Sequence, residues 1–246
     1  PIYDALFGQN FLKHVLVRQE AGAVHAAEGY ARSSGKVGVL LVTSGPGVTN
    51  VVTGLTDALM DSIPIVCFSG QVPSHLIGTD AFQECDTTGI TRPCTKHNYL
   101  VKDITKLPEI IHEAFEIARS GRPGPVLIDI PKDIQFAKSV YKKKSDVTFK
   151  SHRIKAGSKD IDRGFIEKLI DHIKKSQKPV FYVGGGCLNS GPKASQELMK
   201  LVQLTNIPIT TTLHGLGCYP AEDEKSLGML GMHGTYEANL AMNQCD

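Results

Sequence analysis

Four short loops hold the residues of this sequence whose types could bind or activate a small molecule. Each loop follows a run of apolar residues typical of a buried strand. The first loop contains Glu20, and the others are Ser44-Gly45-Pro46-Gly47, Gly70-Gln71-Val72-Pro73 and Pro131-Lys132-Asp133. In open parallel sheets, ligands gather at the carboxyl ends of the strands, where loops and the unpaired N–H groups of helix N-termini lie. The sequence therefore predicts one ligand site built from all four loops.

Position alone leaves two interpretations of Glu20. A carboxylate at the start of a helix complements the helix dipole, which is a structural role, or it serves the ligand site. The residues after it, Ala21, Gly22 and Ala23, form a small-residue helix face that permits close packing of another surface or a flat ligand. Glycines in residues 44–47 likewise let a ligand approach the backbone, although an ordinary strand-to-helix turn uses them too.

Alternating strands and helices must position these loops. Short Val/Ile/Leu-rich runs bounded by Gly, Pro or Ser predict buried strands, and apolar residues at steps of three and four predict helices. The expected strands are residues 15–17, 37–43, 63–69 and 126–130, and the expected helices are about 21–33, 48–61 and 106–119. This order predicts an α/β domain with a parallel sheet in a three-layer arrangement.

A polar segment separates this domain from a second one. Residues 137–162 are rich in Lys and Ser, which predicts an inter-domain connection. Beyond it the expected elements are a helix at 165–174, a strand at 180–183, a helix at 194–204 and a strand at 207–212. We therefore expect domains at residues 1–140 and 163–246 with a linker at 141–162, the second domain being part of a Rossmann-like α/β fold.

The overall composition excludes several classes of protein. With 27 Lys and Arg against 25 Asp and Glu in 246 residues, the net charge of +2 gives no reason to expect nucleic acid or an acidic membrane as a partner. No apolar run in these residues approaches the ~18 residues of a membrane span, and we expect no secretory leader. Six cysteines without a C-x-x-C pair indicate reduced thiols in a cytosol-like compartment.

Several long segments resemble one enzyme family. In order over about residues 1–140 they are RQEAGAVHAAEGYARSSGKVGVLLVTSGPGVTN, GQVPSHLIGTDAFQECDTTGITRPCTKHN and SGRPGPVLIDIPKDIQ. They are similar to the N-terminal, pyrimidine-binding domain of acetohydroxyacid synthase (acetolactate synthase) large subunits, which use thiamine diphosphate. The second domain resembles the central domain of that family through KPVFYVGGG, ITTTLHGLG and SLGMLGMHG.

The resemblance implies a role for each matching residue of the first domain. Glu20 would hydrogen-bond a ring nitrogen of the aminopyrimidine and favour its imino tautomer, whose nitrogen removes the proton from the thiazolium carbon. Gln83 and Lys132 would complete the catalytic set with Glu20. The implied cofactor-side positions are Glu20, Pro46, Asn50 and Gln83. The implied substrate-channel positions are Pro73, Phe82, Lys132 and Met232.

The glycine run that follows the strand at 180–183 is not a dinucleotide fingerprint. Its sixth position is Asn189 rather than Gly, and the next strand ends in threonines rather than an acidic residue for a ribose hydroxyl, which disfavours hydride transfer with NAD. The family instead holds FAD across this domain, in a role that is not redox. The implied FAD positions are Arg122, Gly184, Gly185, Gly186, Thr212, Leu213, His214, Leu230, Gly231, Met232 and His233.

Parts of the family pattern are missing from these residues. The sequence contains no Gly-Asp-Gly motif with a downstream Asn, the arrangement that holds Mg²⁺ and the diphosphate, so the magnesium ligands are expected in a further domain. None of the nine histidines shows metal-ligand spacing, and we predict no metal ligand here. We also expect a chain truncated at both ends, inactive as residues 1–246 alone.

The intact protein is expected to decarboxylate pyruvate and condense it with a second 2-oxo acid, pyruvate or 2-oxobutyrate, in branched-chain amino acid biosynthesis. The family implies a homodimer or homotetramer, with or without a small regulatory subunit, in a bacterial cytoplasm or an organelle. Pyruvate oxidase and glyoxylate carboligase are alternatives, which the GTDAFQE string and Glu20 respectively disfavour. A non-catalytic paralogue is a third, disfavoured by the joint presence of Glu20, Gln83 and Lys132.

Overall fold

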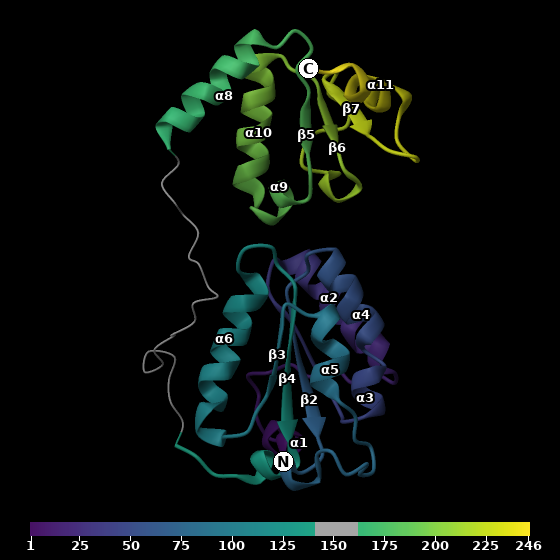
Figure 1. The fold of residues 1–246 in the computed structure, drawn as a ribbon, viewed down its shortest axis with the longest axis vertical. Coiled ribbons are helices and arrows are strands. Elements are labelled where there is room, and N and C mark those ends of the chain that lie inside the picture. Colours follow the sequence, from purple (N-terminus) through teal and green to yellow (C-terminus); the bar gives the residue numbers. More distant parts are fainter. Residues whose placement is uncertain (141–161) are drawn as a thin grey trace. The chain divides into compact units, whose positions relative to one another are not determined.

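The computed structural model describes residues 1–140 and 162–246, which belong to two compact units divided between Gly157 and Ser158. Each unit contains one parallel sheet with helices packed on it (Figure 1). The α/β class expected from the sequence is thus confirmed for both units. The linker predicted at 141–162 lies outside the described residues except for Asp162, whose side chain caps the first helix of unit 2 by accepting a hydrogen bond from the Gly164 N–H at 2.9 Å.

Unit 1 is built on a four-stranded parallel sheet with the strand order β1-β2-β4-β3. The strands are β1 (Gly38–Val42), β2 (Ile65–Gln71), β3 (His97–Leu100) and β4 (Pro125–Pro131). The helices are α1 (Ile2–Leu6), α2 (Glu20–Ser34), α3 (Pro46–Thr49), α4 (Val52–Met60), α5 (Thr87–Thr91), α6 (Leu107–Arg119) and α7 (Lys132–Phe136), with 3-10 turns η1 (Ser74–Leu76), η2 (Arg92–Cys94) and η3 (Ile104–Lys106).

Helices cover both faces of this sheet, with α2 and α4 on one side and α6 on the other (Figure 1). Ile65 on β2 faces the cluster formed with α2 and α4, whereas the next residue, Val66, faces the cluster formed with α6. Because both faces are buried, the strands are apolar almost throughout. Gly54 allows α2 and α4 to pack closely, since a Cβ there would lie 2.1 Å from Val24 Cγ1.

The first expected strand is wrong. Residues 15–17 lie in no strand, and Val15 and Leu16 are 69% and 79% exposed. A strand is stable only when its N–H and C=O groups pair with a neighbour, and in the described residues this segment pairs with no strand of the sheet. Its apolar residues therefore do not make it a strand, and Glu20 begins α2 after an irregular segment.

The other three expected strands of unit 1 are confirmed, with ends displaced by one or two residues. The edge strand β3 is not predicted by the sequence, because its four residues include His97 and Asn98 and are only half-buried. β3 pairs with β4 alone and is partly buried, so it lacks the continuous apolar pattern of β2 and β4, whereas β1, at the other edge, keeps an apolar sequence.

Unit 2 has a three-stranded parallel sheet with the order β5-β6-β7. Its strands are β5 (Phe181–Val183), β6 (Ile209–Thr211) and β7 (Ser226–Met229), its helices are α8 (Arg163–Lys175), α9 (Gly186–Asn189), α10 (Pro192–Thr205) and α11 (Tyr236–Gln244), and η5 (Leu213–Gly215) is a 3-10 turn. The expected helices and strands are confirmed. The sequence does not predict β7, which contains Gly228 at φ +78°. Among the helices of the described ranges, none has the length and apolarity needed to cross a membrane.

Candidate active site

The parallel strands bring three of the four predicted loops to one edge of the sheet in unit 1. The register pairs Val42 with Ser69 and Gln71 with Pro131, so β1, β2 and β4 run to the same edge. The segments that leave this edge are residues 43–45, which lead into α3, residues 72–73, and residues 132–133, which begin α7 directly after β4. The arrowheads of β2 and β4 point towards it in Figure 1.

Glu20 reaches this group through a helix instead of a strand. It is the first residue of α2, but the cap of that helix is Gln19, whose side-chain oxygen accepts a hydrogen bond from the Gly22 N–H at 3.1 Å. The Glu20 carboxylate accepts a hydrogen bond from Asn50, with 3.0 Å between Oε2 and Nδ2. Asn50 ends α3, which follows β1, so this bond ties α2 to the strand-end loops. Gln19 is thus the capping residue of α2, while Glu20, in the first turn, both complements the helix dipole and contacts Asn50.

The loop that carries Gln83 contacts the turn after β1. Gly45 has φ +57° and ψ −111°, and a Cβ there would lie 2.6 Å from the Gln83 carbonyl oxygen, so only glycine fits. Gln83 itself has φ +59°, a left-handed conformation that costs free energy for a residue with a side chain. Gln83 is thus held beside Gly45 and the exposed Pro46, the first residue of α3.

Lys132 and Phe82 are exposed, Phe82 to 89%. Lys132 begins α7 directly after β4, and the next residue, Asp133, accepts hydrogen bonds from the N–H and hydroxyl of Ser74 at 2.9 and 3.1 Å. These bonds, the N–H foremost, hold the pKa of Asp133 below its ordinary value. Because Ser74 follows Pro73, Asp133 joins the loop of Pro73 to the loop of Lys132.

Beneath this edge lies a buried polar network that the sequence analysis missed. Asp129 on β4 is 1% exposed and Gln71 on β2 is 6% exposed, and Gln71 Nε2 donates to Asp129 Oδ2 at 3.0 Å. The Ser69 hydroxyl donates to Asp129 Oδ1 at 2.7 Å. Gln71 Nε2 also lies 3.1 Å from the Cys85 carbonyl oxygen and 3.2 Å from Thr87 Oγ1. The network therefore links the interior of the sheet to the segment after Gln83.

The signal for this network was present in the sequence, since Ser69, Gln71 and Asp129 are polar residues inside otherwise apolar strands. Burial raises the pKa of Asp129 from its ordinary 3.8 to about 6, although hydrogen bonds from Ser69, Gln71 and Thr87 act in the opposite direction. Burial first, and then the negative charge of Asp129, raise the pKa of the Cys67 thiol. Cys67 is therefore a core thiol and not a nucleophile.

A second missed group joins α2 to α4. His25, Glu28 and Asp57 bring potential ligand atoms within 4.8 Å of one another, and His25 Nδ1 lies 2.6 Å from Glu28 Oε2. Burial raises the pKa of Glu28, and in the part of the chain that the structure describes its Oε1 has no hydrogen-bond partner. His25 and Glu28 are three apart on α2, a spacing that places both side chains on one face of the helix.

In unit 2 the predicted FAD residues follow the three parallel strands. Gly184, Gly185 and Gly186 follow β5, Thr212 to His214 follow β6, and Leu230 to His233 follow β7. A Cβ on Gly185 would lie 3.0 Å from His214 Cβ, so the glycine loop and the loop after β6 pack directly on each other. Leu213 and Met232 are 64% and 91% exposed.

The loop after β7 has an anchor that the sequence did not suggest. The side chain of Asn239 on α11 accepts a hydrogen bond from the Gly231 N–H at 2.9 Å and donates to the Gly231 carbonyl at 3.0 Å. Gly231 has φ +109°, which favours glycine. This side chain therefore fixes the bend that precedes Met232 and His233.

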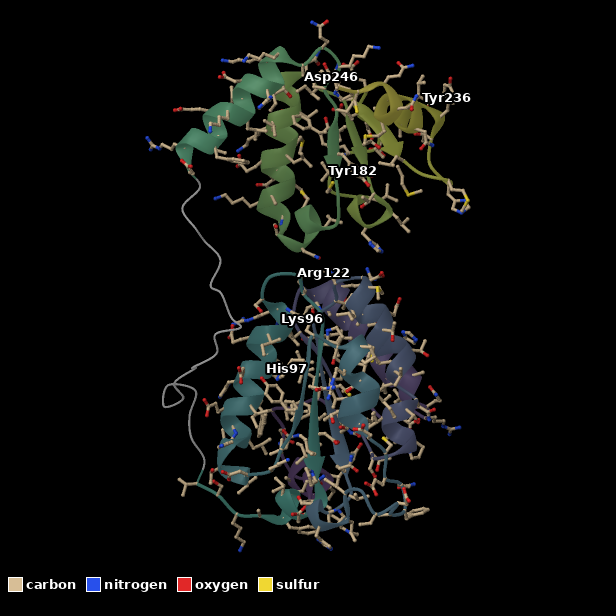
Figure 2. All side chains as sticks on the ribbon, in the orientation of Figure 1. Lys96, His97, Arg122, Tyr182, Tyr236 and Asp246 are labelled. Atoms are coloured by element: carbon tan, nitrogen blue, oxygen red, sulfur yellow. The ribbon has the colours of Figure 1, made fainter. Side chains whose placement is uncertain are left out.

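Arg122 is not brought together with the other predicted residues of unit 1. It lies before β4, at the end of the unit where the strands begin, as does Lys96 (Figure 2). Its guanidinium donates to the carbonyl oxygens of Met60 and Leu59 at 2.5 and 3.2 Å and to Ser62 Oγ at 2.7 Å. Within unit 1, Arg122 thus caps the C-terminal end of α4.

Sequence comparisons relate both units to one class of enzymes. Residues 1–90 match the profile described as "thiamine pyrophosphate enzyme, N-terminal TPP binding domain", and residues 166–246 match "thiamine pyrophosphate enzyme, central domain". These matches fall on the two α/β units.

Relatives with the name acetolactate synthase align with the whole chain. The chain is 52% identical over 245 residues to the chloroplastic acetolactate synthase of Arabidopsis thaliana, covering 100% of the chain and 36% of that protein. It is 49% identical over 247 residues to the acetolactate synthase isozyme 3 large subunit of Escherichia coli, and 48% over 247 residues to the large subunit of Haemophilus influenzae, covering 100% of the chain and 42% of each. The chain thus spans between 36% and 42% of the length of these relatives.

Proposed function

We propose that the full-length gene product of this chain is an acetolactate synthase. The chain belongs to the thiamine pyrophosphate enzymes and is homologous along its whole length to acetolactate synthase large subunits. The reaction is the decarboxylation of pyruvate and its condensation with a second 2-oxo acid, pyruvate or 2-oxobutyrate. The product serves valine, leucine and isoleucine biosynthesis.

The observation that carries the proposal is the position of Glu20. Its carboxylate lies 3.0 Å from the Asn50 amide, beside the glycine turn that contacts Gln83, at the edge of a parallel sheet where ligands bind. Oε2 accepts from Asn50, and among the described residues Oε1 has no hydrogen-bond partner. A partly exposed carboxylate with one oxygen available suits the ring nitrogen of an aminopyrimidine, so the donor set fits thiamine diphosphate.

The cofactor and the chain would divide the chemistry between them. When bound, thiamine diphosphate supplies the nucleophilic carbon and the electron sink for the carbanion left by loss of carbon dioxide. Glu20 would hold and move the proton on the pyrimidine ring, and Asn50 would fix the direction of the Glu20 carboxylate. Gln83, with Pro46, would bound the cofactor side. Lys132, exposed at the start of α7, would attract the carboxylate of a 2-oxo acid.

The remaining cofactor and partner assignments belong to the same proposal. FAD, in a role that is not redox, would bind along the strand-end loops of unit 2, where Gly185 lets the loops after β5 and β6 pack directly on each other. Mg²⁺ would bind through groups of the full-length protein beyond these residues. The large-subunit names of the relatives favour a small regulatory subunit as a partner of a homodimer or homotetramer. Bacterial and chloroplastic relatives support a bacterial cytoplasm or an organelle as the location.

The test uses the full-length gene product with pyruvate, thiamine diphosphate, Mg²⁺ and FAD. Acetolactate is expected as the product from pyruvate. Hydrogen peroxide formed from pyruvate and oxygen, or tartronate semialdehyde formed in a parallel assay with glyoxylate as the substrate, would assign one of the alternative enzymes. Glu20→Gln should lower turnover by about 10²–10⁴-fold, because proton transfer is impaired. Glu109→Gln is the matched control, since Glu109 is an exposed carboxylate in the first turn of α6. Equal turnover in both variants would refute the role of Glu20.

A further inference from the structure

The loop of residues 78–87 carries Phe82 and Gln83 at its tip, and its internal shape depends on Glu84. The Glu84 carboxylate accepts hydrogen bonds from the N–H of Gly78 and, at 2.9 Å, from the N–H of Ala81. These bonds close the loop on itself. They do not connect the loop to the sheet, so its position must be set by other contacts.

A contact that connects the end of this loop to the sheet comes from one side chain. Gln71 Nε2, on β2, lies 3.1 Å from the Cys85 carbonyl oxygen and 3.2 Å from Thr87 Oγ1. Gln71 and Thr87 are 6% and 1% exposed, so water is not available to replace a lost bond. The Cys85 carbonyl is only two residues from Gln83, so among the described residues this is the buried hydrogen bond to the sheet that lies nearest to the tip, beyond the packing of Gln83 on Gly45.

The orientation of the Gln71 amide is decided by Asp129. With Nε2 towards the Asp129 carboxylate, Oε1 accepts a hydrogen bond from the Val72 N–H at 2.8 Å. If the amide were turned over, Oε1 would face two acceptors, the Asp129 carboxylate and the Cys85 carbonyl, and Nε2 would face the Val72 N–H. The carboxylate therefore selects the orientation in which Nε2 reaches the loop.

We propose that Gln71, oriented by Asp129, is a positioning residue that holds the 78–87 loop so that Phe82 and Gln83 stand at the active site. This inference rests on the proposed function and on the positions that the family resemblance implies, Phe82 at the substrate channel and Gln83 on the cofactor side. Gln71 and Asp129 act through the loop backbone. Releasing the loop should lower kcat/KM for pyruvate by about 10- to 100-fold, the usual effect of a small misplacement of reacting groups.

Two single variants of the full-length protein separate positioning from ordinary stability. Gln71→Met keeps the size of the side chain and removes the contact with the loop, whereas Ser69→Ala removes the bond to Asp129 on the side away from the loop. Ser69→Ala removes one buried hydrogen bond, whereas Gln71→Met removes those to Asp129, Cys85, Thr87 and the Val72 N–H. Both variants should therefore lower Tm, and Gln71→Met should lower it more. Only Gln71→Met should lower kcat/KM as stated, with Ser69→Ala within about threefold of wild type. Equal kcat/KM values in the two variants would overturn the proposal.

Amide hydrogen exchange of residues 78–86, measured by mass spectrometry, tests the same contact without an activity assay. Loss of the buried contacts with the Cys85 carbonyl and Thr87 Oγ1 should speed exchange there by at least about tenfold in Gln71→Met. Ser69→Ala should leave it at the wild-type rate. If the wild-type protein makes no acetolactate, the proposed function is refuted. If the exchange rate in Gln71→Met equals that of wild type, the positioning role of Gln71 is refuted.

The double variant Asp129→Asn with Gln71→Glu is the sharper control. The new amide can donate to the new carboxylate, so the bond between β2 and β4 persists, but position 71 then offers only oxygen to the Cys85 carbonyl. We expect the loop of this variant to exchange as fast as in Gln71→Met, with a Tm close to that of Ser69→Ala. Wild-type exchange in the double variant would show that the pair is merely structural.

Discussion

Replacing Asp129 by Asn tests whether burial or hydrogen bonding dominates the environment of this carboxyl group. The group is 1% exposed, which disfavours its charged form, yet Ser69 and Gln71 donate hydrogen bonds that favour it. Burial outweighs the hydrogen bonds and raises the pKa from 3.8 to about 6. The folded protein therefore binds a proton more tightly at this position than the unfolded chain does.

The sign and size of the effect on stability follow from that difference. Because the folded-state pKa is raised, the stabilising contribution is fully present below pH 3.8 and is lost as the pH rises through about 6. The full displacement corresponds to about 3 kcal/mol. About 2 kcal/mol of this stabilising contribution is lost between roughly pH 4.5 and 7.5, a range in which wild type and Asp129→Asn can be compared.

The assay is urea unfolding of wild type and Asp129→Asn at several values in that range, followed by far-UV circular dichroism. Asparagine does not titrate, so the free energy of unfolding of wild type relative to the variant should fall by about 2 kcal/mol as the pH rises. Other groups with displaced pKa values, such as Glu28, occur in both proteins and cancel. If the free energy of unfolding of wild type minus that of the variant stays constant to within about 0.5 kcal/mol, or grows with pH, then the hydrogen bonds to Asp129 outweigh the effect of its burial.

Two further substitutions test the packing that supports the site. Gly54→Ala places a methyl group 2.1 Å from a methyl of the fully buried Val24, so we expect the free energy of unfolding in urea to fall by about 1–2 kcal/mol, despite a gain of about 1 kcal/mol in helix propensity. Adding Val24→Ala in the same chain should recover part of this loss. A Gly54→Ala variant more stable than wild type would contradict the close contact of α2 and α4. Lys96 Nζ donates to the carbonyl oxygens of Ile117 and, at 2.6 Å, of Ser120, at the end of α6. Lys96→Met removes this donor and should lower the free energy of unfolding by about 1–3 kcal/mol. An unchanged urea midpoint would mean that this lysine does not cap the helix.

The buried strands could be predicted from the sequence, because burial on both faces leaves a continuous apolar pattern. Residues 63–69 and 126–130 show that pattern and form β2 and β4. Residues 15–17 show it too and form no strand, because the pattern reports burial preference and not the presence of a pairing neighbour. The edge strand β3 was missed for the opposite reason, since it pairs with β4 although it is polar and half-buried.

The site could be predicted only in part. Parallel strands place loops 43–47, 72–73 and 131–133 together by topology alone, so their shared edge followed from the sequence. The contact between Glu20 and Asn50 and the one between Gln71 and Cys85 join residues that no local pattern relates. Their geometry depends on how helices and loops pack on the sheet, which spacing in the sequence does not encode.

The contact between Gly45 and the Gln83 carbonyl has a consequence for comparing homologous sequences. A glycine in a ligand-binding turn is commonly assumed to be retained for the ligand. Here the backbone of another loop already fills the space that a side chain would need. An invariant glycine at this column of an alignment would therefore be expected even in a descendant that had lost the cofactor, as long as it kept the loop. Its replacement would instead mark lineages in which the loop had changed course, so variation at position 45 should track variation near position 83.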